Sequence, residues 1–140
     1  MVDLTEFESI SPYTDEQASE ALGKLADYPA VAQASRYFFP EESPDFLKNV
    51  LKQIKTIDQF QVLVMQRFVR WVLEHTAKNF SYDGISNIDP NKKFLALSNH
   101  RDIIMDPAIT QLVLHTNGIP MTEIAVGDNL ITNEAIEYLI

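Results

Sequence analysis

The sequence changes character near residue 80, and this change constrains its fold more than any other feature. Before that point, apolar residues recur at the spacing of helices that bury one face. After it, short apolar runs alternate with turn residues and with shorter helical patterns. Helices followed by a β-α-β order are typical of a helical region joined to a sheet domain. The pattern therefore predicts a mixed α/β fold, with a helical N-terminal region over 1–78 and the beginning of an α/β domain over 79–140.

Two of the helices expected in the first region carry clear start signals. Thr14 precedes one of them, and Gln17 follows three positions later, so the two can form a capping box. Ser43 is a candidate N-cap for a later helix, and Pro44 suits its first position because the first helical N–H has no partner within the helix. A further short helix is expected between them, in the segment "PAVAQASRYFFP".

The longest apolar stretch is expected to form a helix from about Gln61 to about Lys78, after a break over 56–60. It is nearly apolar all round, so it is either central to the core or lies against a partner or a bilayer surface. No run reaches the roughly 18 apolar residues that a transmembrane helix needs. The acidic N-terminus also lacks the basic flank and apolar run of a secretory signal. These features predict a soluble, cytoplasmic protein.

Composition narrows the partners and the chemistry. The net charge of −9 argues against nucleic acid, because phosphate backbones are bound by clustered Lys and Arg. It also argues against tight binding of anionic lipid over the whole surface. The absence of cysteine excludes disulfides, thiolate metal ligands and cysteine nucleophiles.

Beyond residue 79, short apolar runs between turn residues predict strands. The clearest extends roughly from Lys93 to Ser98, and its continuous apolar character suits a strand buried on both faces. Asp106 and Pro107 are the expected cap and first residue of a helix that Asn117 and Gly118 end. The remaining segments predict, in order, a strand and turn in "FSYDGI", a strand in "TEIAV" and a helix in "NEAIEYLI".

His100 follows the clearest strand, at the edge of a parallel sheet where catalytic groups gather. A neutral imidazole can take the proton from a hydroxyl or amine that attacks an ester or thioester. It works best when a carboxylate bonds its other nitrogen. Asp106 is the preferred partner if the loop folds back, and Asp102 is closer in sequence but is expected to point elsewhere. The alternative is that Asp106 only caps a helix and that His100 is an ordinary loop residue.

The block "SNHRDIIMDPAI", preceded by "FLAL", resembles the first sequence block of the glycerolipid acyltransferase superfamily, which includes lysophosphatidate and glycerol-phosphate acyltransferases. Asn99, His100 and the apolar flanks match that block. Five residues separate His100 from Asp106 where the family pattern has four. The longer spacing resembles ornithine-lipid N-acyltransferase-like members. The resemblance covers about residues 79–140, and the helical prefix would correspond to helices that lie against the membrane.

The resemblance implies transfer of a fatty acyl group from acyl-CoA or acyl carrier protein to a hydroxyl or amine of a lipid precursor, in phospholipid or aminolipid biosynthesis. His100 would be the general base and Asp106 its orienting carboxylate. Asn99 and Arg101 would flank the base and contact the substrate. No metal or redox cofactor is implied, and a peripheral contact with the inner face of the cell membrane is expected.

The family's later block, a Gly-rich acidic segment with an Arg for the acceptor's phosphate, has no counterpart in these residues. The chain therefore resembles an N-terminal piece of a longer acyltransferase. Such a piece is expected to be inactive alone and to associate with itself through unpaired strand edges and apolar helix faces.

Two other classes are compatible with parts of the pattern. A binuclear metallophosphoesterase also uses an Asn-His and a Gly-Asp element, but in the opposite order and with more histidines than the three present. A non-catalytic interaction or regulatory domain would use the same residues only as a loop and a helix cap.

Overall fold

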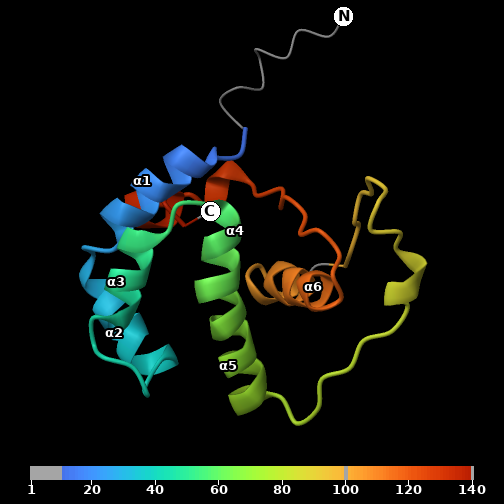
Figure 1. The fold of residues 1–140 in the computed structure, drawn as a ribbon, viewed down its shortest axis with the longest axis horizontal. Helices are drawn as coiled ribbons and strands as arrows, with labels where there is room; N and C mark the ends of the chain where they lie inside the picture. The colour runs from blue at the N-terminus through green and yellow to red at the C-terminus, as the bar shows by residue number, and fades with distance from the viewer. Residues whose placement is uncertain (1–10, 100, 140) are drawn as a thin grey trace, which may run out of the picture. The chain divides into compact units, whose positions relative to one another are not determined.

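The computed structural model of this protein describes residues 11–99 and 101–139. The chain divides into two compact units, one made of Met1–Phe60 with Val126–Ile140 and the other of Gln61–Ala125. Every regular element in the described residues is a helix or a helical turn (Figure 1). The predicted mixed α/β class is therefore wrong, and the described residues form an all-helical fold.

The first unit contains the N-terminal helices together with the last part of the chain. Its elements are α1 (Asp15–Leu25), α2 (Pro29–Phe38), α3 (Phe46–Gln53), α4 (Ile57–Phe60), η4 (Asp128–Leu130) and α7 (Glu134–Glu137). The predicted capping box of α1 is confirmed, since the Gln17 N–H donates to Thr14 Oγ1 (3.3 Å) and the Thr14 N–H donates to Gln17 Oε1 (2.9 Å). The short helix predicted in "PAVAQASRYFFP" is α2.

Two boundaries in this unit differ from the prediction. The helix expected to begin at Pro44 begins at Phe46, because Phe46 donates its N–H to the Ser43 carbonyl (2.9 Å) and closes a turn first. The expected break over 56–60 is helical from Ile57 onward, where Thr56 Oγ1 accepts the Gln59 N–H (3.1 Å). Because Thr56 caps α4, the non-helical break between α3 and α4 is shorter than predicted.

The core of the first unit forms where α3 packs against both α1 and α2. Its buried apolar side chains include Leu22, Leu25, Val31, Leu47, Leu51 and Ile54. The fully buried Ser35 Oγ accepts the Leu47 N–H (3.2 Å), which helps to satisfy the start of α3 inside the core. Ser19 Oγ donates to the Ile54 carbonyl (2.8 Å) and joins α1 to the end of α3.

The second unit contains η2 (Gln61–Met65), α5 (Gln66–Thr76), η3 (Ile85–Asn87) and α6 (Met105–Thr116). The long helix predicted from about Gln61 to about Lys78 is present. It begins with the π-helical turn η2, continues as α5 and ends at Thr76. Helix α5 packs against α6. α6 ends as predicted at Asn117 and Gly118, whose φ of 70° requires glycine. Within 11–99 and 101–139, no helix is both long and apolar enough to cross a membrane.

The three predicted strands are absent from the described residues, and two of them show the physical reason. Residues 93–99 have no assigned regular structure, and no backbone hydrogen bond joins them to another part of the chain that the structure describes, so they lack the ladder that defines a strand. The backbone of Thr122 is bonded instead by a side chain: its N–H donates to Gln111 Oε1 (3.0 Å), and Gln111 Nε2 donates to its carbonyl. A buried glutamine on α6 therefore bonds the backbone of Thr122, the first residue of "TEIAV", in the way that a neighbouring strand would have done.

Candidate functional site

The predicted catalytic block lies at the start of α6, and Asp106 holds its loop in place. Asp106 is in the first turn of the helix, where its Oδ2 accepts the backbone N–H groups of Arg101 (2.6 Å) and Asp102 (2.9 Å). Hydrogen bonds from backbone N–H groups to a carboxylate are among the stronger ones in proteins. The loop that precedes the helix is thereby folded back onto Asp106.

Asp102 takes the capping role that the sequence suggested for Asp106. Its Oδ1 accepts the N–H groups of Ile104 (2.9 Å) and Met105 (2.7 Å), at the start of α6. The helix begins one residue before Asp106, so this carboxylate lies inside the first turn and not in front of it. The two carboxylates therefore bond different segments: Asp102 bonds the start of α6, and Asp106 bonds the loop before it.

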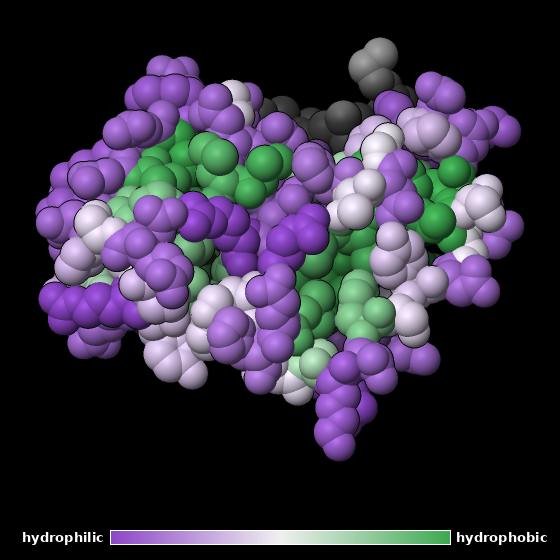
Figure 2. Space-filling view, turned by 60° about the horizontal axis from the view of Figure 1, so that its bottom comes forward, coloured by the Kyte–Doolittle hydropathy of each residue, from purple (hydrophilic) through white to green (hydrophobic). Residues whose placement is uncertain are grey.

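The other predicted site residues are described only in part. His100 lies outside the described residues, so its pairing with Asp106 stays a prediction. Asn99 and Arg101 are exposed on either side of it in the sequence. The large apolar side chains that flank the block are also exposed: Leu95 by 82%, Leu97 by 87%, Ile103 by 55% and Ile104 by 59%. Figure 2 shows that one face of the molecule is mostly hydrophilic with apolar patches among the polar side chains.

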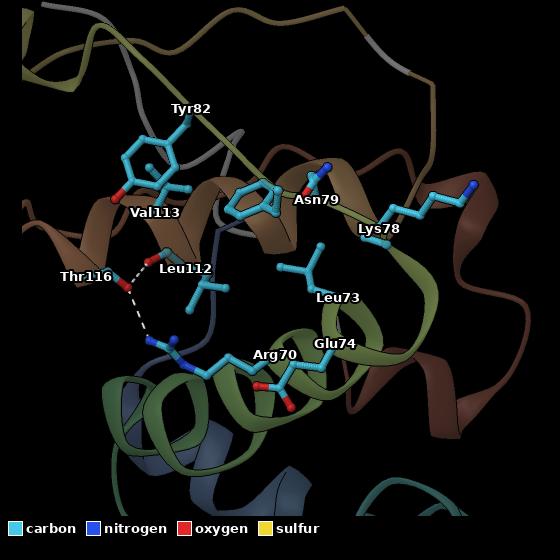
Figure 3. A pocket seen from close by; sticks show the side chains of 11 residues that line it. Arg70, Leu73, Glu74, Lys78, Asn79, Tyr82, Leu112, Val113 and Thr116 are labelled. Atoms are coloured by element: carbon cyan, nitrogen blue, oxygen red, sulfur yellow. Dashed lines mark hydrogen bonds between the residues drawn. The ribbon is translucent and has the colours of Figure 1, made fainter.

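Sequence reasoning missed a pocket of about 460 Å³ between α5 and α6 (Figure 3). It is lined by Arg70, Leu73, Glu74, Ala77, Lys78, Asn79, Phe80, Tyr82, Leu112, Val113 and Thr116. Arg70 Nη2 donates to Thr116 Oγ1 (3.3 Å), and Thr116 Oγ1 donates in turn to the Leu112 carbonyl (2.7 Å). The only sequence signal was that Arg70, Glu74 and Ala77 share one face of a helix.

This pocket is remote from the Asp106 loop along α6. Asp106 is in the first turn and Thr116 is the last residue of the helix, so about 15 Å of helix axis separates them. A second pocket of about 270 Å³ shares Phe80, Tyr82 and Val113 with the first and is otherwise lined mainly by isoleucines. Neither pocket is lined by Asn99, Arg101, Asp102 or Asp106.

The charges at the first pocket do not favour one sign of ligand. Arg70 and Lys78 are cationic, whereas Glu74 is anionic and the last carbonyls of α6 carry partial negative charge. No group of three or more side chains in 11–99 and 101–139 is placed to hold a metal ion.

No protein-family model, no curated protein and no solved structure matches this chain. Its function is therefore inferred from the residues and their geometry.

Proposed function

We propose that this chain carries the catalytic block of an acyltransferase, which moves a fatty acyl group from acyl-CoA or acyl carrier protein to a hydroxyl or amine of a lipid precursor. One observation supports the proposal most: the Asp106 carboxylate accepts the backbone N–H of Arg101, the residue next to His100 in the sequence. The orienting carboxylate is thus held at the loop to which the proposed base belongs. Because such acceptors lie at bilayer surfaces, we extend the proposal to a peripheral contact with the inner face of the cell membrane.

In the proposed reaction, His100 takes the proton from the acceptor's hydroxyl or amine while its oxygen or nitrogen attacks the thioester carbonyl. The carbon–sulfur bond then breaks, and the imidazolium returns the proton to the leaving thiolate. Asp106 would keep the imidazole in the tautomer that can accept this proton and would stabilise the imidazolium. The balance of protons and electrons closes without a redox partner.

The test measures thiol release from acyl-CoA in the presence of hydroxyl or amine acceptors. His100→Ala should lower turnover by about a hundredfold or more, the usual contribution of a positioned general base. His115→Ala is the matched control, because His115 is an exposed histidine in the last turn of α6, and its substitution should leave turnover unchanged. Since the chain is expected to be inactive alone, the assay should be run on the full-length protein if the source gene continues beyond Ile140.

A comparison of the two aspartates decides which one orients the base. Asp106→Asn should lower the turnover number more than it raises the Michaelis constant, because it disturbs the tautomer and not the binding of substrate. Asp102→Asn should have the smaller effect, since asparagine is also a good cap for a helix. Equal turnover of the His100→Ala variant and the wild type would refute the mechanism.

A non-catalytic interaction domain is the second candidate, and one observation favours it. Leu95 and Leu97, immediately before the block, are among the most exposed apolar side chains of the described residues. Exposed apolar side chains of this size commonly mark a surface that binds another molecule. This function would survive the His100→Ala substitution, which separates it from acyl transfer.

A further inference from the structure

Two of the four glycines follow a residue whose side chain can react with the next backbone N–H, in the pairs Asp83–Gly84 and Asn117–Gly118. The glycine nitrogen attacks the side-chain carbonyl carbon of the residue before it and closes a five-membered imide ring. Glycine favours this attack because it has no Cβ to obstruct the approach. The residue types alone favour reaction at Asn117, since an amide side chain closes this ring more readily than a carboxyl does. The structure favours the other pair.

At Asn117–Gly118, both reacting groups are bonded to other residues. The Gly118 N–H donates to the His115 carbonyl (3.0 Å). Asn117 Nδ2 donates to the Val113 carbonyl (2.7 Å) and to Tyr82 Oη (3.0 Å). Two of these bonds satisfy carbonyls at the end of α6, which have no partner within the helix. Ring closure at Asn117 would have to break these bonds, so the folded chain opposes it.

At Asp83–Gly84, the reacting groups are bonded to each other. The Gly84 N–H donates to Asp83 Oδ1 at 2.6 Å, which is short for such a hydrogen bond, so the attacking nitrogen lies beside the carboxyl carbon. Asp83 is exposed, and neither its carboxyl nor the Gly84 N–H has another hydrogen-bond partner within 11–99 and 101–139. By contrast, Asp89 and Asp102 bond N–H groups at least two residues further along the chain.

We propose that Asp83 is a site of spontaneous isomerisation to isoaspartate. In the first step, the Gly84 nitrogen bonds to Cγ of the protonated carboxyl, and the nitrogen's proton leaves with the carboxyl hydroxyl as water. In the second step, water opens the imide. Opening at Cγ restores aspartate, whereas opening at the main-chain carbonyl frees the α-carboxylate and leaves the backbone running through Cβ and Cγ. One water is released and one is consumed, so the change needs no oxidant, reductant or other reactant.

The product has one additional carbon in the backbone immediately after Tyr82. The Tyr82 side chain lines both pockets of the second unit, and its hydroxyl is the group that Asn117 bonds (Figure 3). Isomerisation at Asp83 therefore changes the loop that forms part of the wall of both pockets.

The test compares the folded chain with the same chain kept unfolded in guanidinium chloride. After prolonged incubation at neutral pH, peptide mapping with electron-transfer fragmentation distinguishes isoaspartate from aspartate. The folded protein should accumulate isoaspartate at residue 83 and keep the side-chain amide of Asn117. The unfolded chain should show the reverse order, with Asn117 losing its amide first.

Asp83→Glu is the matched variant, because it keeps the carboxyl but must close a six-membered ring, which forms far more slowly. It should abolish the isoaspartate of the folded protein, measured as methyl groups accepted from an isoaspartyl methyltransferase. Asp89→Glu is the control and should leave this amount unchanged, because Pro90 has no N–H to attack Asp89.

Three results would overturn the proposal. The first is a folded protein that forms no isoaspartate at residue 83. The second is methyl acceptance that persists in the Asp83→Glu variant, which would place the reaction at another residue. The third is loss of the Asn117 amide before isomerisation of Asp83 in the folded protein, which would mean that the hydrogen bonds at the end of α6 give no protection.

Discussion

Two aspartates near the start of α6, Asp102 and Asp106, bond different backbone N–H groups. Asp102 and Asp106 are four residues apart in the sequence, yet Asp102 bonds the start of α6 and Asp106 bonds the loop that precedes it. The sequence made Asp106 the preferred partner of His100 if the loop folds back, and in the structure Asp106 accepts the N–H of Arg101, while its pairing with His100 stays a prediction. It did not predict the exchange of the capping role, because either aspartate suits a cap and only the loop geometry chooses between them.

Asp27 is the second organising carboxylate, and it should make the first unit sensitive to acid. Its Oδ1 lies 2.9 Å from both Lys52 Nζ and Lys48 Nζ, which joins the end of α1 to α3. Hydrogen bonds from Lys52 and then Lys48 lower the pKa of Asp27 below its usual value. A carboxyl with a lowered pKa stabilises the fold above the unfolded pKa of about 3.9, and the contribution is lost as the pH falls through the folded pKa.

Asp27→Asn should therefore lower stability at pH 7 and make no difference at a pH well below 3. Urea unfolding curves of the variant and the wild type should differ at neutral pH and converge in acid. Glu41→Gln, at an exposed carboxyl before α3, is the control, and its unfolding free energy should follow that of the wild type at every pH. A gap between wild type and Asp27→Asn that persists unchanged in acid would contradict the role given to this ion pair.

At the scale of elements, the helices were predictable because their signals are local. Thr14 with Gln17 marks the start of α1, and Gly118 marks the end of α6, each within a few residues of the boundary it sets. A strand has no comparable local signal, because its stability comes from hydrogen bonds to a neighbouring strand that is often distant in the sequence. The apolar run ending at Ser98 reads as a strand, but no second strand in the described residues pairs with it.

Gln111 shows how a helix can replace such a neighbour, and its removal should be costly. Its side chain is only 4% exposed, and its amide bonds both the N–H and the carbonyl of Thr122. Gln111→Leu introduces an apolar side chain of similar size and leaves these backbone groups unpaired, at a cost of about 1–3 kcal/mol of unfolding free energy.

Urea unfolding and hydrogen exchange at the Thr122 amide would measure this effect. Gln111→Glu keeps the acceptor and loses the donor, so it should lie between the wild type and Gln111→Leu. Thr110→Val, at an exposed residue of the same helix, is a control for changes to α6 itself. Unchanged exchange at Thr122 in the leucine variant would show that its backbone is held by something else.

At the scale of the whole molecule, the division into two compact units could not be predicted from the sequence, because it depends on contacts between residues that are distant in the chain. The second unit begins at Gln61, and the last residues of the chain, from Val126 onward, join the first unit. That return from Val126 onward depends on long-range contacts: Tyr28 Oη donates to Glu134 (3.1 Å), 106 residues away. The pocket between α5 and α6 depends in the same way on packing that no local pattern reveals.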